Sequence, residues 1–268
     1  MSFVAAAVCP HPPILVPEVG RAEPVEVRDQ AVAAVRRLVA ARPDRIVVLG
    51  DAPVRTWYGS SATGSLAGFG VNLTIPLASP GSSASPGSSA PSGVVEAPER
   101  APLPLSLTVG AWLLAAAGWA GERSALGVPA EFGPAEAARL GAGLAATSGP
   151  AERLGLLVMG DGSARRTLKA PGGLDERAAG FDAAVARALA GVDPEALLAL
   201  DPVLAADLLA AGRASWQVLA GALREVAPQG APSASWQGDV SYDDAPYGVG
   251  YLVATWTHRP ARDDSRRG

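Results

Sequence analysis

The chain has 268 residues, of which 49% are hydrophobic and 18% are charged, and its formal net charge is −4. This composition is ordinary for a globular protein, and the length is sufficient for a full hydrophobic core. The acidic balance argues against nucleic acid or an anionic membrane surface as the main partner.

The number of cysteines and the amino-terminal sequence argue against disulfide-linked, secreted and membrane proteins. Cys9 is the single cysteine, which excludes an intramolecular disulfide and a thiolate metal cluster. The first residues lack a basic segment and soon reach Pro10, so they do not resemble a signal peptide. No run of about 18 apolar residues would span a bilayer. We therefore expect a cytoplasmic protein with no membrane partner.

The first elements predict a βαβ unit. Residues 3–9 are short and apolar, as in a buried strand. Residues 24–42 place Val27, Ala31, Ala34, Val35 and Leu38 on one stripe of an amphipathic helix. Residues 44–51 follow as a β-branched strand, so the two strands are expected to run parallel.

Further along the chain, strands and helices continue to alternate. A Gly/Ser-rich loop covers 57–70 and a strand 71–77; helices are expected at 103–119, 134–147, 174–190, 194–211 and 214–227, and strands at 153–163 and 245–256. Residues 78–102 contain SPGSSA twice and predict a flexible insert. The fold class is α/β, with a central mostly parallel or mixed sheet flanked by helices. We expect a single domain over 1–258 and a disordered tail over 259–268.

Polar residues follow several of the predicted strands. His11 follows the first strand, Asp51 ends the second, Asp161 follows the apolar LLVM within 153–163, and Asp243 and Asp244 precede the closing strand. Sites in open α/β sheets gather at the carboxyl ends of strands. One imidazole with several carboxylates suits Fe(II), Mn or Zn. A structural histidine and aspartates that form turns or helix caps are the alternative. The second histidine, His258, is expected in the solvated tail.

The stretch "CPHPPILVPEVG" resembles the opening of the class III extradiol ring-cleavage dioxygenase catalytic subunits, the LigB-type fold that includes the Memo-like proteins. "IVVLGDAP", "GSLAGFG", "LPLSLTVGAWLL", "VMGDGSARR" with a later "FD", and "YDDAPYGVGYLVA" are similar to later segments of that family. The resemblance covers the chain outside 78–102 and implies a LigB-like domain.

The resemblance also implies specific site residues. In the family, two histidines and a glutamate hold Fe(II), and a further histidine moves the catechol protons. His11 matches the first metal histidine, whereas Asp51 stands at the second, Asp244 at the glutamate and Ala164 at the acid/base histidine. Because Ala164 cannot move a proton, ring cleavage is not expected; acid/base help is worth roughly 10²–10⁴-fold.

Two functions remain open from the sequence. The first is a dioxygenase-like protein without ring-cleavage activity that keeps the cleft for a small molecule or a partner protein. The alternative is a metal-dependent enzyme, such as a dioxygenase-like oxidoreductase, in which His11, Asp51 and Asp244 hold Fe(II), Mn or Zn and Asp161 is a nearby base. A homo-oligomer and a partner subunit that supplies the missing groups both stay open.

Overall fold

The computed structural model describes residues 3–21, 25–79, 90–147, 151–227 and 235–258. The strands are β1 (Phe3–Cys9), β2 (Arg45–Asp51), β3 (Thr56–Tyr58), β4 (Thr63–Ser65), β5 (Thr74–Pro76), β6 (Val95–Glu96), β7 (Glu122–Val128), β8 (Leu154–Met159), β9 (Trp236–Asp244) and β10 (Tyr251–His258). The α-helices are α1 (Glu26–Ala40), α2 (Leu105–Ala116), α3 (Pro134–Ala146), α4 (Arg177–Gly191), α5 (Pro194–Leu198), α6 (Pro202–Asp207) and α7 (Arg213–Val226); the short 3-10 helices are η1 (Pro13–Leu15) and η2 (Ala67–Phe69).

Eight strands form one mixed sheet in the order β6-β3-β7-β2-β8-β1-β10-β9, and β4 and β5 form a separate pair. The central strands β7, β2, β8 and β1 run parallel, whereas β10 is antiparallel to β1 and β9 is antiparallel to β10. The carboxyl ends of β7, β2, β8, β1 and β9 therefore meet at one edge of the sheet. This is the carboxyl edge referred to below. The α/β fold class predicted from the sequence is confirmed.

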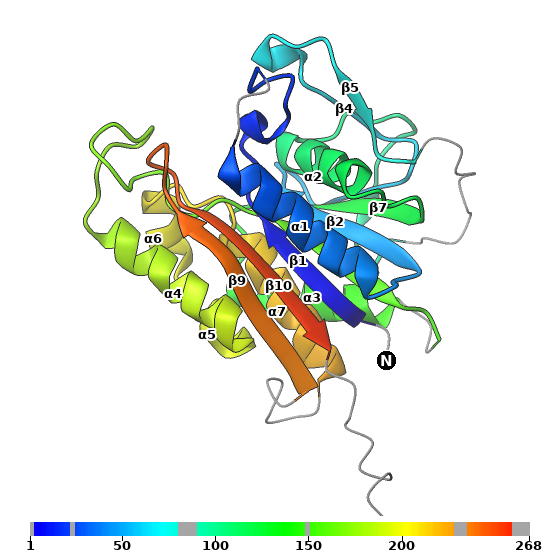
Figure 1. The fold of residues 1–268 in the computed structure, drawn as a ribbon. Coiled ribbons are helices and arrows are strands. Elements are labelled where there is room, and N and C mark those ends of the chain that lie inside the picture. The colour runs from blue at the N-terminus through cyan, green and yellow to red at the C-terminus, as the bar shows by residue number, and fades with distance from the viewer. Residues whose placement is uncertain (1–2, 22–24, 80–89, 148–150, 228–234, 259–268) are drawn as a thin grey trace, which may run out of the picture.

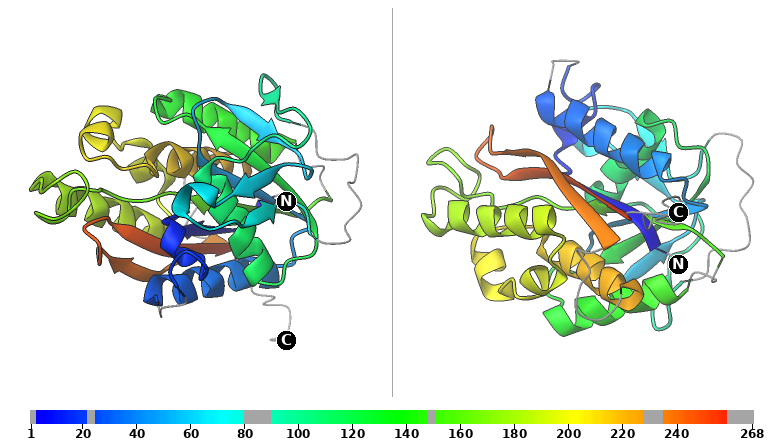
Figure 2. Two further views of the ribbon diagram at one scale, coloured as in Figure 1. Left: turned by 90° about the horizontal axis from the view of Figure 1, so that it is seen from above. Right: turned by 60° about the horizontal axis from the view of Figure 1, so that its bottom comes forward.

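Helices cover both faces of the sheet (Figures 1 and 2). Helices α1 and α2 pack on one face of the sheet, and α3, α4, α5 and α7 cover the other. Each face of the sheet has its own hydrophobic core. The apolar stripe predicted for the first helix is the face that α1 buries. Strands β1 and β8 are buried along their whole length, which explains their unbroken apolar sequences, because parallel strands are covered on both faces.

Several elements differ from the sequence-based expectation. Strands β3, β4, β6, β7 and β9 were not predicted, and the strand expected at 245–256 begins only at Tyr251. The helix expected at 194–211 is two helices. Pro202 cannot continue a helix because it lacks an N–H, and Asp201 caps the new one by accepting the Val203 N–H at 2.8 Å.

The expected βαβ unit and insert are present in altered form. Strands β1 and β2 flank α1 and are parallel, but β8 lies between them. Within 78–102, residues 95–96 form β6, which pairs with β3, while residues 80–89 and the predicted tail 259–268 lie outside the described residues. No helix in the described part of the chain is long and apolar enough to cross a membrane.

Candidate functional site

The carboxyl edge of the sheet brings together the polar residues that the sequence singled out. His11 follows β1, Asp51 is the last residue of β2, Asp161 follows β8, and Asp244 ends β9. The structure adds Glu131, which follows β7. The sequence-based expectation missed Glu131 because it missed β7; the available signal was the short run of small and apolar residues at 125–128, followed by Pro129.

His11 and Asp161 form the innermost part of this site. The His11 backbone N–H donates to Asp161 Oδ1 at 2.8 Å, and the imidazole Nδ1 lies 3.6 Å from the same oxygen. His11 is only 9% exposed. The ends of their strands are joined because the Gly160 N–H donates to the Cys9 carbonyl. Asp161 thus fixes the backbone of His11 by a hydrogen bond, whereas its distance from the ring Nδ1 is longer than a hydrogen bond.

Asp51 lies within electrostatic range of this pair. Burial raises the pKa of the Asp51 carboxyl, the nearby His11 lowers it, and the negative charge of Glu131 raises it again. The Asp51 backbone carbonyl accepts the Ser106 hydroxyl at 2.7 Å, which connects the end of β2 to the start of α2. Asp51 is therefore a partly buried carboxylate that interacts electrostatically with a histidine and with a second carboxylate.

The start of α7 holds two of these segments in place. The Gly212 N–H donates to the Asp161 carbonyl at 2.9 Å. The buried guanidinium of Arg213 donates to the carbonyls of Ala130 and Phe132, on either side of Glu131. One helix terminus thereby positions both Asp161 and Glu131.

Glycine is needed where α7 meets β8. A Cβ on Gly160 would lie 2.5 Å from the Gly212 Cα. Residues with larger side chains would push the α7 terminus away from the strand and release its bond to Asp161.

Tyrosines of β9, β10 and their connecting turn lie beside these carboxylates. Burial raises the pKa of Tyr251, and the charges of Asp161, Tyr247 and Tyr242 raise it further. The rings of Tyr247 and Tyr251 are 6.4 Å apart between centroids. This side of the site therefore offers aromatic faces and neutral phenol groups.

Asp244 does not join His11 in a ligand cluster. Its carboxylate accepts the N–H of Ala245 at 2.7 Å, so it forms the turn that follows β9. Among the residues that the structure describes, no three His, Cys, Asp or Glu side chains are arranged to hold a metal ion. The predicted set of His11, Asp51 and Asp244 does not fit a metal in this arrangement, and we derive no chemical step through one.

The loop that follows β8 carries Ala164, the position matching the family's acid/base histidine. Its backbone amides are used internally: those of Ser163, Ala164 and Arg166 donate to Asp182, to Leu208 and to Gly248, respectively. These amides are not available to cradle a phosphate.

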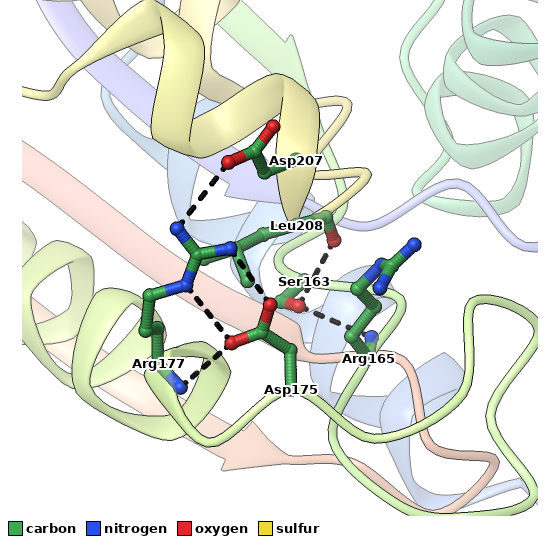
Figure 3. Close-up of polar contacts among 6 residues, drawn as sticks. All are labelled: Ser163, Arg165, Asp175, Arg177, Asp207 and Leu208. Atoms are coloured by element: carbon green, nitrogen blue, oxygen red, sulfur yellow. Dashed lines mark hydrogen bonds and ion pairs between the residues drawn. The ribbon is translucent and has the colours of Figure 1, made fainter.

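Side chains also anchor this loop (Figure 3). The Ser163 hydroxyl donates to the Leu208 carbonyl at 3.0 Å. Arg177 bridges Asp175 and Asp207, and its hydrogen bonds lower the pKa of Asp175 to about 2. The loop that follows β8 therefore has a structural role at the carboxyl edge of the sheet.

His258 lies at the opposite edge of the sheet. It ends β10 and contacts the Trp236 ring edge-to-face, with centroids 5.6 Å apart. The expectation that it belongs to a solvated tail was wrong because strand pairing with β9 continues to this residue. It borders a cavity of about 500 Å³ whose lining includes Arg37, Asp239 and Thr255.

The comparisons with known proteins support the fold alone. No family model matches the sequence, and no curated protein matches it. A solved structure, of the uncharacterized protein JW3007 from Escherichia coli K12, is similar with a TM-score of 0.58 and 14% sequence identity. The match covers 95% of this chain and 99% of that one.

Proposed function

We propose that this protein is a divergent relative of the class III extradiol dioxygenases that binds a small molecule at the carboxyl edge and does not cleave aromatic rings. The observation that carries the proposal is the buried contact between His11 and Asp161, with Nδ1 3.6 Å from Oδ1. In the described part of the chain the imidazole Nδ1 has no hydrogen-bond partner, so this buried ring is suited to hydrogen bonding with a ligand.

The absence of ring cleavage follows from the side chains at the positions that match the family. Ala164 has no group that could take or give a catechol proton. Asp51 supplies oxygen in place of a second imidazole, and harder ligands of this type disfavour the iron site used to activate dioxygen.

Ligand binding is tested by NMR on protein with ¹⁵N-labelled histidine. The chain contains only two histidines, and His258, at the far edge, is an internal control. Binding of small aromatic probes is expected to shift the His11 resonance and leave that of His258 unchanged. Probes that shift neither resonance, or both equally, would contradict a binding site at His11.

Loss of ring cleavage is tested with an oxygen electrode, using Fe(II)-supplemented protein and catechol. We expect no more oxygen uptake than His11→Ala shows. Oxygen uptake that depends on His11 and yields a ring-opened product would refute the proposal. It would favour the alternative, a metal-dependent enzyme with His11, Asp51 and Asp244 as ligands. That alternative requires the three side chains to move together, because ligand atoms lie about 2 Å from a shared ion.

A further inference from the structure

We propose that the ligand of this site carries an organic ammonium group, bound among the carboxylates of Asp51, Asp161 and Glu131. The inference rests on the proposed function, because it specifies the ligand of the same site. It adds Glu131 to the site as a residue that selects for positive charge.

The first argument is unbalanced charge. Among the described residues, Asp51 and Glu131 form no ion pair, and the only ion-pair partner of Asp161 is the His11 imidazole. Arginines on segments near this edge have other partners: Arg55 lies over the Phe132 ring and pairs with Glu136, and Arg166 pairs with Asp182. A positively charged ligand would neutralise this edge, whereas an anion would be repelled.

The second argument is the buried imidazole. His11 is nine-tenths buried, and its Nδ1 has no hydrogen-bond partner in the described part of the chain. A buried polar atom without a partner costs about 1–3 kcal/mol, so such atoms are uncommon away from functional sites. An ammonium is a donor-only group with several N–H bonds. It complements a site whose carboxylates accept hydrogen bonds and whose buried ring nitrogen has no partner among the described residues.

The third argument is that the backbone beneath two of the carboxylates is held in place before binding. The Gly212 N–H donates to the Asp161 carbonyl, and Arg213 donates to the two carbonyls that flank Glu131. Asp161 and Glu131 therefore lie on supported segments that follow β8 and β7. Binding at supported segments loses less free energy to backbone ordering than binding at mobile ones.

The fourth argument favours an organic cation over a bare metal ion. The Tyr247 and Tyr251 rings lie on the same edge, and the charge of Asp161 is felt by Tyr251. Aromatic faces attract alkylammonium groups and pack against their carbon atoms. A metal ion instead requires a convergent ligand set, which no three acidic, His or Cys side chains provide in the described residues.

The test compares probes of one shape and different charge: benzylammonium, benzyl alcohol and benzoate. Affinities are measured from the ¹⁵N shift of His11, with His258 as the unaffected signal. Benzylammonium is expected to bind about tenfold tighter than benzyl alcohol, and benzoate more weakly than either. Equal or tighter binding of benzyl alcohol or benzoate overturns the ammonium inference but leaves the proposed function standing. No shift with any probe means that the proposed function itself fails.

Variants of the acidic residues show which side chains select for the positive charge of the probe. Asp51→Asn and Glu131→Gln should each weaken benzylammonium binding about two- to fivefold and leave benzyl alcohol unaffected. The charge-matched control is Glu225→Gln, at the exposed far end of α7, which should change neither affinity. Equal effects of Glu225→Gln and Glu131→Gln contradict a local role for Glu131. A His11 shift with Mg²⁺ or Zn²⁺ at lower concentration than benzylammonium contradicts an organic ligand.

Discussion

The guanidinium of Arg166 contacts the carboxylate of Asp182 at 2.8 Å, and the two partners differ sharply in burial. The Asp182 side chain is 1% exposed, whereas that of Arg166 is 24% exposed. Asp182 also accepts the Ser163 N–H at 2.8 Å. This carboxylate of α4 therefore ties the loop after β8, and with it the candidate site, to the body of the protein.

Arg166→Met is expected to destabilise the fold by about 2–4 kcal/mol, because it leaves the buried Asp182 carboxylate without its cation. Urea denaturation measures the change. The control Arg187→Met removes an exposed arginine from the same region, on α4, and should change stability by no more than about 0.5 kcal/mol. Equal stability of the two variants would show that the ion pair contributes nothing.

Asp182 should also impose a pH dependence on stability. Burial raises the pKa of Asp182, an effect that its hydrogen bonds with Ser163 and Arg166 only partly offset. Because the folded pKa is above the unfolded value, the contribution to stability is full below the unfolded pKa and is lost as pH rises through the folded pKa. Asp182→Asn should therefore gain stability relative to the natural chain as the pH rises from about 4, the unfolded pKa of an aspartate, through the raised folded pKa. A difference that is constant with pH would contradict the raised pKa.

Gly250→Ala is expected to be strongly destabilising. An added Cβ would lie 2.1 Å from Asp182 Oδ2, so either the carboxylate or the start of β10 must move. Overpacking of this kind costs about 1–3 kcal/mol. Gly180→Ala is the matched control, because Gly180 lies in α4 with nothing within 4 Å of its added Cβ. It should raise stability by about 0.5–1 kcal/mol through helix propensity; a loss as large as that of Gly250→Ala would contradict this account.

Arg213→Met should destabilise the fold by about 2–4 kcal/mol, since it leaves the carbonyls of Ala130 and Phe132 and the buried Gln217 side chain without their donor. Burial lowers the pKa of Arg213, in keeping with its desolvated position. Arg224→Met, at the exposed end of the same helix, should stay within about 0.5 kcal/mol of the natural chain. Denaturant unfolding compares the two variants. Similar unfolding midpoints would contradict a stabilising role for the Arg213 hydrogen bonds.

The Cys9 thiol should be inert in the folded protein. It is fully buried in β1, and burial raises its pKa, so the reactive thiolate is scarce. Labelling with a thiol reagent is expected only as fast as the protein unfolds. Rapid stoichiometric labelling in native buffer would contradict this. The reaction is followed by the absorbance of the product that the thiol reagent releases. Because the chain has one cysteine, this signal reports on Cys9 alone.

Part of the candidate site could be predicted because strand ends are local signals. The apolar runs that form β1, β2 and β8 are followed by His11, Asp51 and Asp161, and parallel strands bring such residues to one edge. Asp244 was placed correctly at that edge, but its carboxylate is used in a turn. A single sequence does not show whether an aspartate after a strand binds a ligand or caps its own backbone.

Glu131 and its support could not be predicted for a different reason. Strand β7 opens with Glu122 and Arg123, and these charges conceal the apolar run. Arg123 is buried there because it donates to the carbonyls of Leu77 and Trp119, and burial lowers its pKa to about 10. Such contacts join residues from distant parts of the chain, so periodicity in the sequence does not reveal them.

The sequence by itself determined the α/β class, the amphipathic face of α1 and the identity of the polar groups at strand ends, because hydrophobic period and strand-end residues are local properties. Only the tertiary structure decided the strand order, which inserts β8 between β1 and β2 and so brings Asp161 to His11. It also decided that the terminus of α7 supports both Asp161 and Glu131. Those outcomes depend on long-range packing, in which Gly160 and Gly212 allow a helix to approach a strand more closely than any local pattern records.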